Sequence, residues 1–351
     1  MKNWSKLGLL SLLALTACTN EEDNDDNGNG GTDNPTVTKA YVINEGAFQG
    51  NNSSISSVDS EGNVEQNLFF TANGEELGDV AQDMIVAEGN GYIVVNNSQK
   101  VEVVDLADFS SVATLSLSYP RHAIEGNGRV FVSNGTTPGG VFEVDPASNS
   151  IIDSVTVGAG PERMAINGTD LLVANFAWGS DSTISVIDMT TLTEERKVTV
   201  GAGPSTIVKD ANENIWVLTN GKTTYNFDWT EVIGQEGSKL VQLSGSDYSE
   251  LKSIALGDST TSVGKMAISA DRQTIYYHNN MVYKMSISAT SVEASAFISD
   301  ENVTGLAINE EGNLVVLTGD YSSNGTMKVY DENGNLVSSH ETGIAPNGIA
   351  F

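Results

Sequence analysis

The sequence predicts an all-β protein, a seven-bladed β-propeller with four antiparallel strands in each blade. Three observations support this prediction. A unit of 40–56 residues recurs seven times, each unit divides into short alternating strands, and the C-terminal segment resembles the start of a unit. The composition, with 35 Gly in 351 residues and 7% aromatic residues, also suits many short strands joined by tight turns.

The repeat is clearest in an apolar, alternating run that closes on Asp or Ser. Its seven copies end at Asp59, Asp105, Asp145, Asp188, Ser244, Ser286 and Asp331, in steps of 46, 40, 43, 56, 42 and 45 residues. The motif Val-Thr-Val-Gly-Ala-Gly-Pro also occurs twice, at 155–161 and 198–204. Periods of this length are typical of propeller blades. A β-solenoid, the structural alternative, has shorter rungs and fits less well.

Each unit divides into four short strands, which we letter A to D in chain order. In the third unit these are 121–125, 129–133, 140–145 and 151–157, separated by turns rich in Gly, Asn and Pro. Apolar and polar residues alternate along them, as expected for half-buried sheet surfaces. No segment after the N-terminal region shows a convincing helical period.

The two ends of the repeat region complement one another. The first unit has no A strand before residues 40–44, whereas the last residues, 344–351, resemble the opening of the fourth unit at 160–166. We therefore expect the C-terminal strand to complete the first blade. Such a closure removes the open sheet edges that would otherwise attract other strands.

The N-terminal region has the pattern of an export signal. Lys2 and Lys6 precede an apolar run at 7–15, which is too short to span a bilayer as a mature helix, and small residues then lead to Cys18. Leu-Thr-Ala-Cys resembles the lipobox of bacterial lipoproteins, which implies cleavage before Cys18 and lipidation of this residue. A plain secretory signal with an incidental cysteine is the alternative. Cys18 is the only cysteine, so an intrachain disulfide is excluded.

The predicted domain organisation has three parts. Residues 1–17 are the signal peptide, residues 18–38 are the lipidated Cys18 followed by an acidic flexible tether, and residues 39–351 are the propeller. The acidic stretch after the cysteine resembles the surface-export signal of Bacteroidota lipoproteins. That resemblance implies an outer-membrane protein, held by its lipid anchor only and exposed on the cell surface.

The charge balance excludes one class of partner. The chain has 46 Asp and Glu against 17 Lys and Arg, a formal net charge of −29. Such a field repels nucleic acid and anionic lipid headgroups, so we expect no nucleic-acid partner.

Asparagine recurs at the end of the B strands. Six units place an Asn there, at Asn44, Asn96, Asn134, Asn175, Asn220 and Asn279. In a propeller the B–C and D–A loops share one face, so these residues are predicted to form a rim of amide donors and acceptors around one space. The alternative is turn chemistry, because Asn tolerates left-handed backbone and bonds its own chain.

Aromatic residues gather in the same predicted loops. The B–C loops contain Phe48, Phe176, Trp178, Tyr225, Phe227, Trp229 and Tyr321, and the D–A loops add Tyr119, Arg121 and Arg163. Three of the aromatics lie in an insertion at 221–237 that lengthens the fifth unit to 56 residues. Exposed loop aromatics indicate a binding surface, unless they cover a small core of the insertion itself. The two arginines are candidates for an anionic group of the ligand, unless they pair with acidic neighbours.

Signatures of catalysis are sparse. His122, His278 and His340 lie in different units, without metal-ligand spacing, and a lone His in a strand is more often structural. The sequence has no Gly-x-Ser-x-Gly elbow, no cysteine in the propeller and no phosphate-binding loop. We therefore expect no enzymatic activity, no metal and no cofactor.

The chain resembles a known group of propellers. The opening from Tyr41 to Ser56 is similar to the first blade of Bacteroidota surface lipoproteins with a YncE-like propeller, and the Val-x-Val-Gly-x-x-Pro and Val-Ile-Asp repeats are similar to YncE-type propellers. The resemblance covers residues 40–351. Members of this group include lipoproteins that bind cobalamin at the cell surface and pass it to a TonB-dependent outer-membrane transporter.

Three functions follow, in decreasing order of preference. The resemblance implies capture of a corrinoid, or another large polar small molecule, for a TonB-dependent transporter. The amide and aromatic loop residues are compatible with the amide groups and the apolar macrocycle of a corrinoid. A surface glycan-binding or protein-interaction propeller would use the same aromatics. A propeller lyase or hydrolase fits least, because the sequence lacks a nucleophile and a metal set.

Overall fold

The computed structural model describes residues 39–257 and 263–351. Residues 1–38 lie outside the described residues. They contain the predicted signal peptide, the lipidation site Cys18 and the acidic tether at 18–38. In the described ranges, no helix has the length and apolar character needed to cross a membrane.

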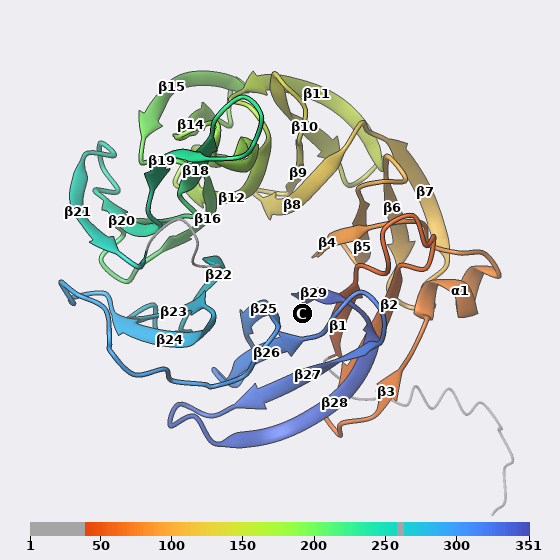
Figure 1. The fold of residues 1–351 in the computed structure, drawn as a ribbon. Helices are drawn as coiled ribbons and strands as arrows, with labels where there is room; N and C mark the ends of the chain where they lie inside the picture. Colours follow the sequence, from red (N-terminus) through yellow and green to blue (C-terminus); the bar gives the residue numbers. More distant parts are fainter. Residues whose placement is uncertain (1–38, 258–262) are drawn as a thin grey trace, which may run out of the picture. The chain divides into compact units, whose positions relative to one another are not determined.

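Seven β-sheets are arranged around a central axis, which confirms the predicted propeller (Figure 1). Blade 1 contains β29 (Pro346–Ala350), β1 (Lys39–Asn44), β2 (Ser54–Asp59) and β3 (Val64–Glu65). Blade 2 contains β4 (Ala81–Ala87), β5 (Asn90–Val95), β6 (Lys100–Asp105) and β7 (Ser111–Ser116). Blade 3 contains β8 (Pro120–Gly126), β9 (Arg129–Asn134), β10 (Gly139–Asp145) and β11 (Ser150–Val157).

The remaining four blades continue around the ring. Blade 4 contains β12 (Pro161–Asn167), β13 (Asp170–Asn175), β14 (Thr183–Asp188) and β15 (Thr193–Thr199). Blade 5 contains β16 (Pro204–Lys209), β17 (Ile215–Thr219), β20 (Lys239–Leu243) and β21 (Glu250–Ala255). Blade 6 contains β22 (Val263–Ile268), β23 (Thr274–Asn279) and β24 (Met281–Ser286). Blade 7 contains β25 (Val303–Ile308), β26 (Leu314–Thr318), β27 (Asn324–Tyr330) and β28 (Leu336–Ile344).

Three elements lie outside the blade sheets. The insertion in blade 5 forms a separate hairpin of β18 (Lys222–Tyr225) and β19 (Val232–Glu236). A short helix, α1 (Leu68–Asn73), connects blades 1 and 2, and a 3-10 turn, η1 (Ala177–Gly179), follows β13. The sequence shows no helical period and therefore did not predict α1, because a helix of six residues is too short to show one.

The sixth blade differs in its outermost position. An isolated bridge between Val282 and Ile298 takes the place of a full fourth strand. The chain before Ile298, residues 288–296, is rich in Ser and Ala, and Val292 is its only large apolar residue. Small residues have little to pack on a pleated surface, so this segment pairs at one point only.

The hydrophobic core lies between the blades. Seven clusters occur in the described ranges, and each joins side chains from two neighbouring sheets. Leu172 of blade 4 and Val217 of blade 5 share one cluster, for example, and Trp216 of blade 5 and Ile275 of blade 6 share the next. Sheets buried on both faces explain why the central strands are nearly continuous apolar runs.

The first and last strands close the ring. β29 pairs with β1 in antiparallel register, with Val42 opposite Ile349 and Ile43 opposite Gly348. The innermost strands then run from β4 to β29 in an unbroken circle around the axis (Figure 1). The predicted closure by the C-terminal segment is confirmed.

The B–C and D–A loops lie on one side of the ring, which we call the loop face. Backbone hydrogen bonds join the two kinds of loop in several blades, such as Gly46 N–H to the Ile344 carbonyl (3.0 Å) and Phe176 N–H to the Gly160 carbonyl (3.0 Å). The β18–β19 hairpin belongs to a B–C loop and stands on the same side. Figure 1 is viewed from the loop face.

Removal of the closing strand tests this account. Deletion of residues 346–351 should lower the free energy of unfolding by about 3 kcal/mol or more, because several ladder hydrogen bonds worth about 0.5–1.5 kcal/mol each are lost together and blade 1 gains an open edge. Deletion of Phe351 alone, which follows the strand, is the control and should change stability little. Denaturant unfolding of both variants measures the effect, and equal stability of the two would contradict closure.

Candidate functional site

Each innermost strand is irregular near its start. The register of the pairing between the first and second strand shifts in all seven blades, within the residues at 81–83, 120–123, 161–164, 204–206, 263–266, 303–305 and 346–348. A β-bulge interrupts the strict alternation of side chains and often re-aims them toward a site. The seven bulges lie at the same level of the ring and surround its axis.

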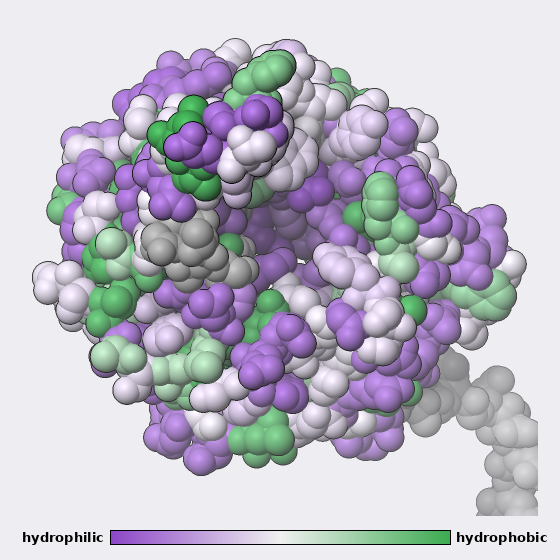
Figure 2. Space-filling view, in the orientation of Figure 1, coloured by the Kyte–Doolittle hydropathy of each residue, from purple (hydrophilic) through white to green (hydrophobic). Residues whose placement is uncertain are grey.

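The residues in the bulges are mostly polar. We call the following set the channel ring: Gln82, Asp83, Arg121, His122, Glu162, Arg163, Ser205, Thr206, Lys265, Thr304 and Asn347. It contains two of the five arginines of the protein. Figure 2 shows the loop face hollowed at its centre, with mainly hydrophilic surface lining the hollow. The propeller therefore has a polar mouth above an apolar body.

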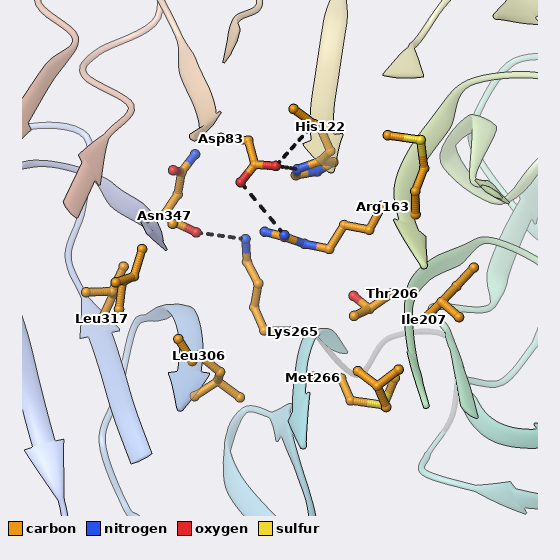
Figure 3. A pocket seen from close by; sticks show the side chains of 16 residues that line it. Asp83, His122, Arg163, Thr206, Ile207, Lys265, Met266, Leu306, Leu317 and Asn347 are labelled. Carbon is orange, nitrogen blue, oxygen red and sulfur yellow. Dashed lines mark hydrogen bonds and ion pairs between the residues drawn. The ribbon is translucent and has the colours of Figure 1, made fainter. Parts of the chain in front are cut away.

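Ion pairs connect three neighbouring blades at this level. Arg121 donates two hydrogen bonds to Glu162, from Nε at 2.9 Å and from its terminal nitrogen at 3.1 Å. The His122 imidazole lies between two carboxylates, with Nδ1 3.2 Å from Asp83 and Nε2 3.1 Å from Glu162 (Figure 3). Asp83 also accepts a hydrogen bond from the Ala123 N–H at 3.1 Å. The network fixes β4, β8 and β12 relative to one another.

These contacts keep two buried carboxyl groups ionised. Burial alone raises the pKa of Asp83, but the charge of His122, its hydrogen bond and the charge of Arg163 outweigh burial and hold the pKa below its usual range. Burial likewise raises the pKa of Glu162, and the contacts with His122 and Arg121 more than reverse that effect. Both groups are charged at neutral pH.

A cavity of about 200 Å³ lies inside the ring beneath this network. One side of it is polar, with Asp83, His122, Arg163, Lys265 and Asn347 (Figure 3). The opposite side is apolar, formed by Ile207, Met266, Leu306 and Leu317, with Thr206 beside them. A cavity of this size holds several water molecules or a small organic molecule.

Lys265 is the unusual cation of the cavity. Its ammonium donates a 3.4 Å hydrogen bond to the Asn347 carbonyl and forms no ion pair with a carboxylate of the described ranges. Burial, followed by the charge of Arg163, lowers its pKa to about 8, although Glu45, Glu162 and Asp83 oppose the change. Burial also raises the pKa of Glu45, which accepts a hydrogen bond from the Asn347 amide.

The predicted asparagine rim is not formed as expected. Asn44 and Asn175 are fully buried, and Asn134 is buried as well. The Asn44 amide donates to Ser56 (2.9 Å) and accepts from the Gly343 N–H (2.9 Å), while the Asn175 amide donates to Thr183 and Ser185 (both 3.0 Å). These side chains tie the B strand to its neighbours and to the D–A loop. They are turned into the protein, where a ligand on the loop face does not reach them.

The other three asparagines are partly buried and also bonded within the loops. The amides of Asn96 and Asn279 donate to the backbone carbonyls of Pro120 and Leu256, each at 2.9 Å. Asn220 accepts a hydrogen bond from Ser205 at 2.8 Å and lines a hollow at the mouth. The turn-chemistry interpretation accounts for most of the six residues.

The predicted aromatics are exposed on the loop face. Phe48, Tyr119, Trp178, Tyr225, Phe227, Trp229 and Tyr321 all have exposed side chains, and Phe176 is half-buried. Trp178 is 78% exposed and Trp229 is 77% exposed, so the insertion does not bury its aromatics in a core of its own. Tyr225 and Trp229 stack on each other, with ring centroids 5.4 Å apart.

Five of the aromatics come from two adjacent loops. Packing joins η1 to the hairpin, where the Gly179 backbone lies against Gly221 and Lys222. The rings of Phe176 and Trp178 are 6.5 Å apart in a tilted arrangement. We call Phe176, Trp178, Tyr225, Phe227 and Trp229 the aromatic crescent. It lies beside the mouth, since Phe176 also lines the hollow that contains Arg121 and Lys265.

The two arginines predicted to contact the ligand differ in how strongly they are paired with carboxylates. Arg121 is committed to Glu162, as the alternative interpretation expected. Arg163 reaches only 3.9 Å from Asp83 and points into the cavity (Figure 3). Sequence reasoning treated His122 as structural and missed Asp83, Thr206, Lys265 and Asn347. Their common signal is the second or third position of each innermost strand, often after a proline such as Pro120 or Pro204.

Two histidines take no part in this site's hydrogen bonds. His278 is buried on β23, and burial, followed by the charge of Lys265, lowers its pKa. His340 lies on β28, beside Gly62 at the outer part of blade 1. In the part of the chain that the structure describes, no group of three or more His, Cys, Asp or Glu is arranged to hold a metal ion.

Comparison with known proteins places the chain in a family. Residues 39–341 match the family DUF5074, a domain of unknown function. The chain belongs to this family. No curated protein sequence matches it. Among solved structures, the DUF5074 chain is similar to a Kuenenia stuttgartiensis hydrazine synthase, with a TM-score of 0.61 and 13% identity over 77% of this chain and 89% of that one.

Two further structures share the fold. The computationally designed Ika8 protein has a TM-score of 0.60 and 12% identity over 89% of this chain and 91% of that one. A Bacteroides caccae protein of unknown function has a TM-score of 0.52 and 11% identity over 90% and 98% of the two chains. At these identities the likeness extends to the fold alone. The family match and the structure support the predicted propeller architecture.

The ion-pair network makes a testable contribution to stability. Glu162→Gln should lower the free energy of unfolding at pH 7 by about 3 kcal/mol, because Arg121 and His122 lose a buried partner. Since the folded pKa of Glu162 is depressed, its stabilisation is present above the unfolded pKa of about 4.3 and is lost as the pH falls through the folded pKa.

The pH dependence distinguishes this effect from a general packing defect. Wild type should therefore lose more stability than Glu162→Gln on acidification, measured by urea unfolding between pH 7 and pH 3. Glu65→Gln, which breaks an exposed pair with Lys39, is the matched control and should cost less than about 1 kcal/mol. Equal losses for the two variants at pH 7 would refute a structural role for the network.

Proposed function

We propose that this DUF5074 protein is a non-enzymatic capture protein that binds a large, partly apolar small molecule on its loop face. The aromatic crescent supplies the contact area and the polar mouth supplies orientation. The preferred ligand is a corrinoid, which the protein passes to a TonB-dependent outer-membrane transporter. The lipid anchor at Cys18 would hold it at the cell surface for this purpose.

One observation carries the proposal. Tyr119, Trp178 and Trp229 are exposed on the loop face and have left-handed backbone, with φ of 53°, 51° and 62°. The left-handed backbone is not specific to these residues, because Val80, Asn302 and Ala345 have it just before an innermost strand, as Tyr119 does. The exposure is specific: large aromatic side chains are costly to leave in water, and these contribute nothing to the core between the blades. A ligand that covers these rings explains why they stand on the loop face.

The crescent and the mouth together match the chemistry of a corrinoid. Such a molecule has a flat apolar macrocycle that indole and phenyl rings cover, and peripheral amides that polar groups of the mouth bind. Phe227 stands fully exposed at the tip of the hairpin, where it extends the apolar surface. The resemblance of the Tyr41–Ser56 opening to cobalamin-binding surface lipoproteins favours this ligand among large polar molecules.

A glycan is the second candidate. Trp178 and Trp229 each expose more than three quarters of the side chain, and exposed aromatic faces stack on sugar rings as readily as on a macrocycle. The strongly acidic surface does not disfavour a neutral polysaccharide. The two candidates differ in valency and size, so direct binding measurements separate them.

Titration calorimetry tests the proposal. Cyanocobalamin should bind the purified protein, and Trp178→Ala and Trp229→Ala should each weaken binding about 30-fold, the loss of roughly 2 kcal/mol typical of a hot-spot aromatic. Phe70→Ala is the matched control, because Phe70 is an exposed aromatic on α1, away from the crescent, and should leave the affinity unchanged.

The possible outcomes distinguish an error in the identity of the ligand from an error in the binding surface. Absence of cobalamin binding at micromolar concentration, with binding of a neutral polysaccharide that depends on the same tryptophans, would replace the corrinoid by a glycan. Cobalamin affinity that is unaltered in both tryptophan variants would remove the loop face as the binding surface.

A further inference from the structure

The cavity inside the ring has a pair of cations that the proposed capture function does not use. The head groups of Arg163, from β12, and Lys265, from β22, point toward one another on the polar side of the cavity (Figure 3). Arg163 is 3.9 Å from its only described carboxylate partner, Asp83. The Lys265 ammonium donates its hydrogen bond to the backbone carbonyl of Asn347. Two like charges that face each other in a partly enclosed space repel each other, although both side chains keep some contact with solvent.

Besides His122 Nδ1, whose one contact is the ion pair with Asp83, two polar side-chain atoms of the residues lining the cavity lack partners. The Thr206 hydroxyl and the Asn347 side-chain carbonyl oxygen are buried and make no hydrogen bond within the described ranges. A buried polar group without a partner costs about 1–3 kcal/mol, so such groups in a native protein usually await a ligand or water. The Thr206 hydroxyl donates a hydrogen bond to any acceptor that enters the cavity.

The charges of the channel ring leave a surplus. Arg121, Arg163 and Lys265 are cations, whereas Asp83 and Glu162 are carboxylates. The network uses Arg121 with Glu162, and Asp83 is shared between His122 and Arg163. One positive charge therefore remains when His122 is neutral and Glu45, whose pKa burial raises, is protonated, and ionised Glu45 cancels it. A surplus this small suits a monoanion and not a dianion.

The apolar wall opposite the cations determines the chemistry of the uncharged part of the ligand. Ile207, Met266, Leu306 and Leu317 give the cavity an apolar side. The space of about 200 Å³ accommodates a short alkyl chain against them, which removes apolar surface of both partners from water. The site therefore has a cationic end and an apolar end, the pattern that an amphiphilic anion matches.

We propose that the channel cavity binds a small monocarboxylate with a short alkyl tail. Its carboxylate lies between Arg163 and Lys265 and accepts a hydrogen bond from Thr206, and its tail packs against the apolar wall. The hollow lined by Arg121, Phe176 and Ser205 adjoins the cavity through the shared residues Arg163 and Lys265, so the ligand enters from the loop face. This site is distinct from the aromatic crescent and goes beyond the proposed capture function.

Calorimetry with simple probes tests this site. Butyrate should bind the purified protein more tightly than acetate, by about fourfold for each methylene that becomes buried. Inorganic phosphate should bind more weakly than butyrate, and butylammonium should not bind. A stronger response to phosphate than to butyrate, or binding of butylammonium as tight as that of butyrate, would overturn the assignment, as would no butyrate binding at tens of millimolar.

Variants locate the anion. Lys265→Met keeps an aliphatic chain of similar length, removes the charge, and should weaken butyrate binding at least tenfold. Thr206→Val is nearly isosteric and should weaken it several-fold, and it keeps the test decisive if the lysine variant folds poorly. Lys197→Met, which removes an exposed lysine of β15, is the matched control and should leave binding unchanged. Unchanged butyrate affinity in a folded Lys265→Met or Thr206→Val protein would refute the site.

The pH gives an independent readout. Lys265 has a pKa of about 8, and the groups that face it are Arg163 and Glu162 on β12, Asp83 on β4, His122 on β8, His278 on β23 and Glu45 in the β1–β2 loop. A bound carboxylate favours protonated Lys265, so butyrate binding near pH 8 should take up protons and affinity should fall as the pH rises above 8. Proton uptake is measured by calorimetry in buffers of different ionisation enthalpy, and its absence would contradict the placement beside Lys265.

Discussion

The whole structure depends on the pairing of its last strand with its first. Blade 1 is complete only when a strand from the end of the chain pairs with β1, and β29 supplies that strand with residues more than 300 positions away in the chain. Because each of the seven apolar clusters lies between two blades, opening the ring at blade 1 removes support from both neighbours at once. Local strand pairing builds each blade, but this one long-range pairing determines that the blades face a common axis.

The axis, in turn, explains where the chemistry is. A regular innermost strand would direct its side chains alternately to the two neighbouring blades, yet each of the seven strands is irregular at the same level. The bulges bring neighbouring polar residues such as Arg121 and His122, or Glu162 and Arg163, to the channel together. The ion-pair network joins three blades, and beyond it the unpaired ends of Arg163 and Lys265 face the cavity. One backbone feature, repeated seven times, thus supplies both a structural clamp and an unsatisfied site.

The architecture could be predicted from the sequence because each blade corresponds to one copy of a sequence repeat. Period, strand length and the match between residues 344–351 and 160–166 each report on one blade, and the seven copies reinforce one another. The loop positions of Trp178 and Trp229 were also predictable, but their exposure was not, because the sequence left open a small core in which the insertion could bury its aromatics.

The asparagines and the channel residues were harder to predict for one physical reason. Asn at the end of a B strand is consistent with a rim or with a buried clamp, and only the contact of Asn44 with Gly343, 299 positions away, decides for the clamp. Likewise, nothing local to Lys265 shows that Arg163 points at it from a different blade. Side chains that meet across an axis do so through the closure of the ring, which a pattern along the chain does not encode.

The protein is acidic overall but has a cationic cavity, so the distances over which the two kinds of charge act decide which ligands reach the cavity. The net charge of −29 belongs mostly to the outer surface, and at physiological ionic strength salt screens it within about 8 Å. Inside the channel, protein walls exclude much of that salt, so the fields of Arg163 and Lys265 act over short distances at a lower effective dielectric. The outer surface repels a dianion with twice the energy that it exerts on a monoanion at the same distance. The channel ring offers either ligand about one surplus positive charge at most. Screened repulsion outside and a positive surplus of about one charge at most inside therefore both favour a singly charged ligand over phosphate or nucleic acid.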